Sequence, residues 1–189
     1  MTYHVVQYDG PFGFIKPWTA VQDGRTYSQQ FLTPSIVEGI RQLLGVGDIL
    51  RHRLSYRGVD DQMERIQAAG WYDKSIRGRK GWREMGRNKS ILYRGVLLEP
   101  RLSLAFSTPS DASVAAAHHL CLCRNEDLLF PTTHYTCTQE EFDSIMGFEL
   151  HFGREHPDNF LVGYNRYQEA APMYGSLRIY GKDASTREA

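Results

Sequence analysis

Basic side chains are concentrated in residues 74–89. Seven of these sixteen residues are Lys or Arg, against the single acid Glu84, and glycines are interspersed among them. Each cation can neutralise a phosphate and release a counterion, so the segment favours salt-dependent binding to a polyanion. Trp82 and Tyr72 add aromatic faces on which an unpaired base can stack. The alternative interpretation is a solvated loop without a ligand. We predict nucleic-acid contacts at these residues: Lys74, Arg77, Arg79, Lys80, Trp82, Arg83, Arg87 and Lys89.

Three further cations are secondary candidates for the same role. Lys16 follows the aromatic stretch that begins at Phe12, and Arg51 and Arg53 alternate with apolar residues over 49–56. A sheet face can bind single-stranded RNA through such side chains. The alternative is that all three are ordinary exposed strand residues. Tyr27 and Phe31 are predicted to belong to the core rather than to a base-stacking surface.

His118 and His119 are the candidate general acid and base. We expect them in the middle of a helix, where neighbouring side chains point about 100° apart, so one of them at most faces a given site. Cys121 and Cys123 nearby raise the question of zinc. On a helix these two thiols would lie about 200° apart and could not readily share an ion. No metal site and no cofactor is therefore expected.

The formal net charge is zero, but the two halves differ. Residues 1–109 carry 16 Lys and Arg against 10 Asp and Glu, whereas residues 110–189 carry 6 against 12. The first part is thus the expected polyanion-binding part. No apolar run reaches the about 20 residues that a membrane helix needs, and no secretory signal is recognisable. Three cysteines without scaffold spacing suit a reducing cytoplasm, which is the predicted location, away from any membrane.

The elements that must position these residues are strands and a few helices. Thr33 and Pro34 predict a helix start and Gly45 its end, with Ile36, Val37, Ile40, Leu43 and Leu44 as an apolar stripe. A second helix is expected from Ser110 to about Cys123. A third starts at a capping box, Thr138 with Glu141, and carries Phe142, Ile145 and Met146 up to Gly147. Short strands are expected at 27–31, 49–56, 91–98, 102–106, 148–152, 160–164 and 177–180. The order fits an α+β fold with the helices on one face of a sheet.

Several motifs together resemble a known family. In order they are Gly10–Pro17 (GPFGFIKP), Tyr27-Ser28, Phe31–Ser35 (FLTPS), Gly39-Ile40, Arg87-Asn88 up to Arg94-Gly95-Val96, Phe130-Pro131, and Tyr135 to Phe142. They resemble the fifth family of CRISPR-associated proteins, in the RAMP superfamily, and most of all its type I-C variety. The likeness covers most of residues 5–146.

This resemblance implies a ferredoxin-like (RRM-like) domain over residues 1–147. Its basic insertion, 57–89, would form a β-hairpin thumb, and residues 148–189 would form a small C-terminal β extension. The implied function is to hold the 5′ handle of CRISPR RNA in a surveillance (Cascade) complex for antiviral defence. The implied partners are CRISPR RNA, the backbone and large subunits of the complex, and target DNA in the assembled complex.

Two alternatives remain open. Type I-C relatives also cut precursor RNA without metal, using a tyrosine near the end of the first helix and a Lys-His pair. This sequence has Leu43-Leu44 and Ala117-His118 at those places, and Tyr56 or Tyr27 would have to substitute. A metal-independent endoribonuclease is therefore the second hypothesis, after the non-catalytic subunit. A small-molecule enzyme with its histidines in a deep apolar pocket is the third.

The basic segment yields a direct prediction. Replacing Lys80, Arg83 and Arg87 with alanine should weaken binding to repeat RNA and flatten its salt dependence, because fewer counterions are released. Binding measured over a series of salt concentrations checks this. A salt slope equal to that of the unchanged protein would contradict it.

Overall fold

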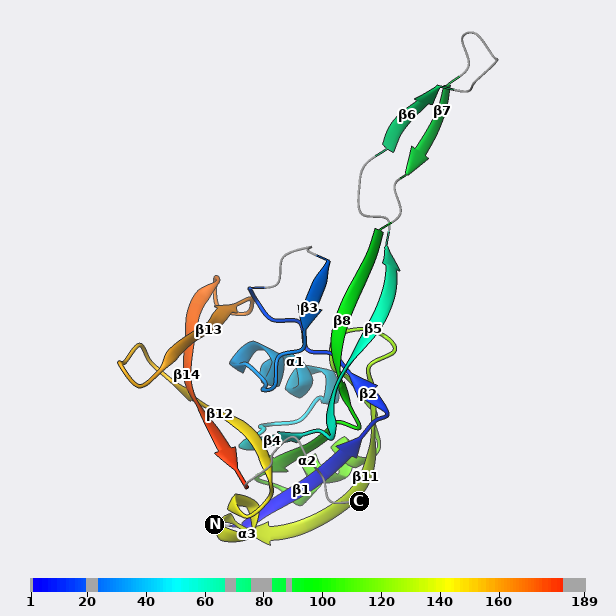
Figure 1. The fold of residues 1–189 in the computed structure, drawn as a ribbon. Coiled ribbons are helices and arrows are strands. Elements are labelled where there is room, and N and C mark those ends of the chain that lie inside the picture. Colours follow the sequence, from blue (N-terminus) through cyan, green and yellow to red (C-terminus); the bar gives the residue numbers. More distant parts are fainter. Residues whose placement is uncertain (1, 20–23, 67–70, 76–82, 88–89, 182–189) are drawn as a thin grey trace.

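One antiparallel sheet of eight strands forms the body of the protein (Figure 1). In spatial order its strands are β10 (Leu120–Cys121), β11 (Leu128–Thr138), β1 (Thr2–Asp9), β9 (Arg101–Phe106), β4 (Arg51–Ser55), β12 (Gly147–Gly153), β14 (Ala171–Tyr180) and β13 (Phe160–Asn165). We describe it from a computed structural model that covers residues 2–19, 24–66, 71–75, 83–87 and 90–181, with the backbone alone for 66, 71–75, 83–87 and 90.

The first helix, α1 (Pro34–Leu44), is confirmed with both of its predicted ends. The Thr33 side chain accepts a hydrogen bond from the Ile36 amide, and Pro34 occupies the first turn. Gly45 ends the helix at φ +68°, a left-handed conformation that glycine adopts without steric cost. Its buried stripe is narrower than predicted, because Leu43 is 65% exposed; the buried members are Val37, Ile40 and Leu44.

The second helix is shorter than predicted. α2 spans Pro109–Ala116, so His118 and His119 follow the helix instead of lying in its middle. The chain then becomes extended, because Leu120 is buried when β10 pairs with β11. Cys121 therefore lies on a strand, and the argument that placed it on a helix with Cys123 was wrong.

The third helix, α3 (Gln139–Asp143), begins at the predicted capping box. Thr138 Oγ1 accepts from the Glu141 amide at 3.2 Å, and Glu141 accepts from the Thr138 amide at 2.7 Å. Phe142 is fully buried, but Met146 lies beyond the helix and is 44% exposed. The short helix is thus anchored by its cap and by one aromatic ring.

The helices cover both faces of the sheet, which corrects the expected one-sided arrangement. Val5 and Val6 are neighbours on β1 and so point to opposite faces. Val6 belongs to the main core cluster, together with the buried residues of α1 and α2. Val5 packs in a second cluster with Phe142 of α3. α3 therefore lies on the face opposite to α1 and α2.

A second, four-stranded sheet is built around β8 (Ser90–Leu98), with which each of its other strands pairs. β5 (Gly58–Ile66) pairs with β8 along one side, while β2 (Phe12–Gly13) and β3 (Arg25–Tyr27) pair with it along the other. β6 (Trp71–Ser75) and β7 (Arg83–Arg87) form a separate antiparallel pair. The strand predicted over 27–31 is therefore β3, which ends at Tyr27.

The last three strands belong to the main sheet. β12 begins at Gly147 and pairs with β4 through Phe148 and Leu54, so the strands between Gly147 and Tyr180 continue the same sheet that the earlier strands build. Within the described ranges, no helix has the length and apolar character to cross a membrane.

Candidate nucleic-acid interface

A long hairpin carries the basic segment away from the body. β5 and β8 pair through nine residues, and β6 and β7 lie beyond their outer ends (Figure 1). Antiparallel strand pairs therefore occupy part of the insertion 57–89, and the role of this insertion as a thumb stays a prediction. Of the predicted contacts, Lys74 lies on β6, and Arg83 and Arg87 lie on β7, with only their backbone described. The remaining ones lie outside the described residues: Arg77, Arg79, Lys80, Trp82 and Lys89. RNA contact by all of them stays a prediction.

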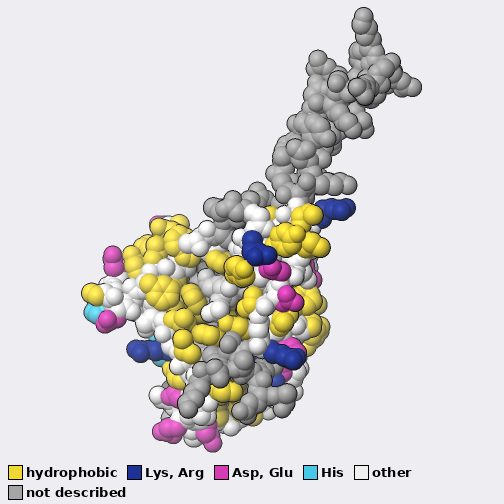
Figure 2. Space-filling view, viewed as in Figure 1, with side chains coloured by type: hydrophobic (Ala, Val, Ile, Leu, Met, Phe, Trp, Pro, Cys, Tyr) yellow, Lys and Arg dark blue, Asp and Glu magenta, His cyan; other side chains and the backbone are white. Residues whose placement is uncertain are grey.

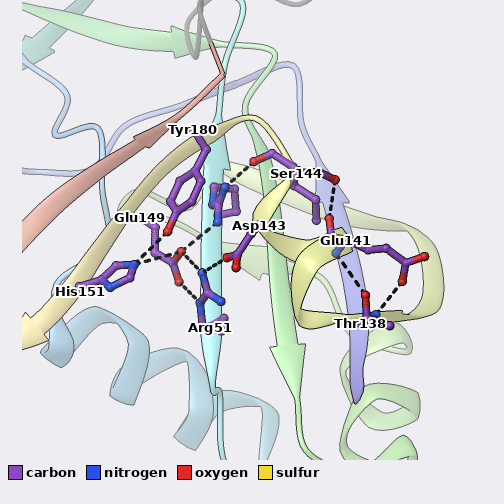
Figure 3. Close-up of polar contacts among 10 residues, drawn as sticks. Arg51, Thr138, Glu141, Asp143, Ser144, Glu149, His151 and Tyr180 are labelled. Atoms are coloured by element: carbon purple, nitrogen blue, oxygen red, sulfur yellow. Dashed lines mark hydrogen bonds and ion pairs between the residues drawn. The ribbon is translucent and has the colours of Figure 1, made fainter. Parts of the chain in front are cut away.

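Arg51 and Arg53 both bind the carboxylate of Glu149 in their own chain, and Figure 3 shows Arg51 beside Glu149. Glu149 on β12 accepts from Arg51 through both oxygens, at 2.6 and 2.7 Å, and from Arg53 at 3.0 Å. Arg51 also donates to Asp143 at 2.9 Å. The Arg53 side chain is 1% exposed, and its guanidinium carbon lies 3.4 Å from the centroid of the Tyr180 ring. Because both cations are paired and withdrawn from solvent, we leave them out of the interface proposed below.

The electrostatics of this cluster favour its ionised form. Burial is the largest single effect and opposes ionisation of Glu149, but the hydrogen bonds from Arg51 and the positive charges of Arg51 and Arg53 together outweigh it and hold the pKa of the carboxyl below its ordinary value. The same bonds raise the pKa of Arg51. Burial lowers the pKa of Arg53, although Glu149 counteracts this shift. A buried carboxylate with two arginines is expensive to break, because removing one partner leaves an unpaired buried charge.

Lys16 lies outside the strands, on the segment that follows β2, and its predicted RNA contact stays a prediction. It is exposed at the edge of a cleft of about 450 Å³ between α1, the segment after β2, and β10. Ser35 of the first helical turn lines the same cleft, and so does Arg166 from the turn after β13. Among the described residues, neither Lys16 nor Arg166 forms an ion pair. Two cations and a hydroxyl around an open cleft are suited to one or two phosphate groups.

Arg166 is the residue that the sequence analysis missed. It stands in the acidic part of the chain, and no local motif marks it. Its position depends on Gly39 of α1, where an added Cβ would come within 3.0 Å of Arg166 Nη2 and 3.1 Å of Tyr167 Oη. Tyr167 Oη also accepts from Arg166 at 2.9 Å. The glycine therefore lets the turn after β13 approach the helix.

The two histidines are exposed and contact few functional groups. The His118 ring nitrogen Nδ1 lies 2.9 Å from the Val114 carbonyl oxygen, and the His119 ring lies against Phe130 with centroids 6.0 Å apart. Tyr56, one suggested substitute for a catalytic tyrosine, is buried and stacked on Phe148. Neither of the two histidine contacts pairs a histidine with the second acid, base or cation that metal-free cleavage needs.

The hollows of the surface are open and partly polar. A second one lies between α1 and the turn after β13, and a third lies between β13 and β14. Neither His118 nor His119 lines these two hollows or the Lys16 cleft. The deep apolar pocket that the small-molecule hypothesis expects around a histidine is thus not among them.

Comparison with known proteins gives a likeness of fold. No family model matches the sequence, and no curated protein matches it. Solved structures do match. The fold resembles a chain of a CRISPR RNA-guided surveillance complex. The two share 11% sequence identity with a TM-score of 0.53, and the match covers 94% of this chain and 88% of the other.

The buried cluster generates a stability prediction. Glu149→Gln should lower the free energy of unfolding by about 3–5 kcal/mol, because Arg53 is left buried without its counter-charge. Asp143→Asn, which removes the more exposed partner of Arg51, should cost less than about 1 kcal/mol. Urea unfolding at neutral pH measures both.

The same variant, Glu149→Gln, should also change how the free energy of unfolding depends on pH under acidic conditions. Because the pKa of Glu149 is lowered on folding, the stability it contributes is complete above its ordinary value of 4.5 and is lost as pH falls through the folded pKa. Glu149→Gln should lack this part of the acid response. Equal costs for the two substitutions, or an unchanged acid response, would contradict the analysis.

The cleft generates a binding prediction. Lys16→Ala combined with Arg166→Ala should weaken RNA binding and reduce the magnitude of the salt slope by about 1.4, which is two phosphate contacts at about 0.7 each. Arg154→Ala with Arg178→Ala removes the same charge from exposed positions outside the cleft and serves as the control. Equal effects of the two double variants would argue against a phosphate site in the cleft.

Proposed function

We propose that this chain binds the 5′ handle of a CRISPR RNA as a subunit of a type I-like surveillance complex. One observation carries the proposal. Residues 74–89 contain seven cations and one acid, they lie in sequence between the two strands of the β5–β8 hairpin, and the fold resembles a chain of a CRISPR RNA-guided surveillance complex. A polyanion is the ligand that such a segment favours.

The topology supports a ferredoxin-like (RRM-like) domain over residues 1–147. Its elements follow the order β1, α1, β4, β9, α2, β11, and the strands lie in the sheet as β11-β1-β9-β4, all antiparallel. This is the β-α-β-β-α-β arrangement of that fold. The hairpin interrupts it between β4 and β9 and would serve as the thumb. Residues 148–189 would be the C-terminal β extension of a protein from the fifth family of CRISPR-associated proteins, type I-C variety.

Two groups of cations would hold the RNA backbone. The hairpin supplies most of the charge, and Lys16 and Arg166 supply a smaller site at the body. Phosphate contacts fix the course of a strand without reading its sequence, so the bases stay available for recognition. Binding of this kind is expected to be strong at low salt and to weaken steeply as salt is added.

The protein partners would be the backbone and large subunits of the complex, with target DNA as a further contact after assembly. Residues 110–189, with 6 basic and 12 acidic side chains, offer a surface unlike the basic hairpin. Charge complementarity of this kind steers association and suppresses wrong pairings. One chain can thus face RNA with one part and protein with another.

The decisive experiment mixes the pure protein with labelled repeat RNA in excess EDTA. We expect the RNA to be bound but not cut, because His118 and His119 lie apart from the other groups that cleavage requires. A gel read under native and denaturing conditions reports binding and cleavage together. Absence of binding to the repeat RNA would contradict the proposal.

Cleavage of the RNA would change the proposed function. Site-specific cutting that is lost on His118→Ala or His119→Ala, with binding intact, would make the protein a processing endoribonuclease. Cutting that survives both substitutions would place an active site elsewhere in the chain.

A further inference from the structure

One face of the second sheet exposes aromatic and apolar side chains beside arginines. The strand register sets Tyr93 opposite Met63 on β5 and opposite Arg25 on β3, and it sets Tyr27 opposite Gly95. Paired residues of neighbouring strands point to the same side of a sheet. Tyr27 is 56% exposed, Tyr93 37% and Met63 67%, and Arg65, two residues further along β5, is also exposed. We call this surface the β3–β8–β5 face.

The other side of the same strands is buried, which fixes the orientation. Leu92 and Val96 of β8 are about 5% exposed or less and point away from the β3–β8–β5 face. Arg94 lies on that buried side, paired with Glu64 and 5.2 Å from the centroid of the Phe14 ring. A shift of the pairing register of β8 by one residue would bury Tyr93 and expose Leu92. On the tyrosine side the exposed surface ends near Gly95, because Leu97, two residues further along β8, is buried in the main core.

Gly95 holds Tyr27 in its place on this face. A Cβ at position 95 would lie 2.2 Å from Tyr27 Cδ1, a distance that real atoms do not reach. Only glycine lets the Tyr27 ring settle directly onto the backbone of β8. The prediction that Tyr27 belongs to the core was wrong for this reason, because the ring packs against one strand and remains open to solvent. A ring fixed in this way loses little freedom when a ligand stacks on it.

Arg25 completes the surface. Its guanidinium forms an ion pair with Asp61 at 2.6 Å and lies 5.6 Å from the centroid of the Tyr93 ring. A planar guanidinium beside an aromatic ring extends the area on which a base can stack. Figure 2 shows hydrophobic side chains gathered where the hairpin leaves the body, with basic side chains next to them.

We propose that the β3–β8–β5 face is a stacking platform for unpaired RNA bases, with Tyr27 and Tyr93 as the two contact rings. The proposal rests on the RNA-binding function proposed above and names how bases are held. The basic segment, residues 74–89, lies in sequence between β5 and β8, so an RNA that binds the segment would be expected to reach this face as well. This continuity favours nucleic acid over a protein occupant.

The spacing of the two rings suggests how many bases they receive. Tyr27 is one strand away from Gly95, which lies two residues from Tyr93 along β8. The backbone positions of Tyr27 and Tyr93 are offset by two residues along the strand, at about 3.3 Å each, and by one strand spacing of about 4.8 Å across the sheet. Together these offsets separate them by about 8 Å. Bases stacked on each other are about 3.4 Å apart. Each tyrosine is therefore expected to receive its own base, from nucleotides that do not stack on each other.

The test uses the full chain and an oligoadenylate of about 12 nucleotides, a length within the range of single-strand binding sites. A second oligonucleotide of equal length carries abasic residues at its centre. Tyr27→Leu with Tyr93→Leu removes the rings but keeps apolar bulk, and Tyr27→Phe with Tyr93→Phe keeps the rings. Tyr164→Leu, at a tyrosine that is 53% exposed on β13, is the matched control.

The unchanged protein should bind the base-containing RNA more tightly than the abasic RNA. The double Leu variant should lose at least about tenfold in affinity for the base-containing RNA, because each stacked base contributes substantially. Its affinity for the abasic RNA should stay unchanged, which also shows that it is folded. The double Phe variant and Tyr164→Leu should behave like the unchanged protein.

Two outcomes would overturn the platform while leaving the RNA-binding function intact. One is a double Leu variant that binds both RNAs as the unchanged protein does. The other is a double Leu variant that binds RNA normally but no longer assembles with its protein neighbours, which would make the face a protein interface. Failure of the unchanged protein to bind any RNA would instead reject the proposed function and the platform with it.

A second measurement needs no substitution. Photo-crosslinking of the unchanged protein to an oligonucleotide containing 5-iodouridine should attach RNA to Tyr27 or Tyr93, identified by mass spectrometry. Crosslinks confined to other residues would contradict the proposal, even if the Leu variant fails to fold.

Discussion

The pairing of Glu149 with Arg51 and Arg53 is the interaction on which the C-terminal third of the sheet depends. β4 and β12 share a single registered pair, Phe148 with Leu54, so the backbone ladder alone joins them weakly. A carboxylate that is 3% exposed costs several kcal/mol to desolvate and is stable only while its arginines remain in place. This requirement holds β12 against β4, and β14 and β13 follow through their own ladders. The turn that carries Arg166 to the Lys16 cleft is therefore positioned by ion pairs on the far side of the sheet.

The fold was predictable from the sequence where its cause is local. The ends of α1 and the start of α3 are set by side chains within one turn of the backbone they cap, so Thr33, Gly45 and the Thr138 box could be read directly. β11 was missed for the opposite reason. Its eleven residues are rich in threonine and contain Pro131, which lies beside the register shift in the pairing with β1. Only that bulge makes proline acceptable in a strand with a neighbour on each side.

The candidate site shows the same limit. Arg51, Arg53 and Lys16 looked alike in the sequence, as cations on or near strands. Arg53 is buried because Glu149 meets it from 96 positions away, whereas Lys16 stays open because the cleft that it lines has no described carboxylate to pair with it. Tyr27 and Phe31 were assigned to the core, on a strand expected over 27–31, yet the strand ends at Tyr27. Charge content was thus readable from the chain, but which charge faces solvent depends on contacts between distant segments.

A protein with no net charge can still bind a polyanion when its charges are separated by more than the screening length. The paired part of β5 and β8 spans nine residues, or about 30 Å at about 3.3 Å per residue. The Debye length at physiological ionic strength is about 8 Å. Acids on the body therefore have little effect on the field at the outer end of β5 and β8, the two strands between which the basic segment lies in sequence. The hairpin thus adds more than length, since it separates that end from the acidic residues of the body.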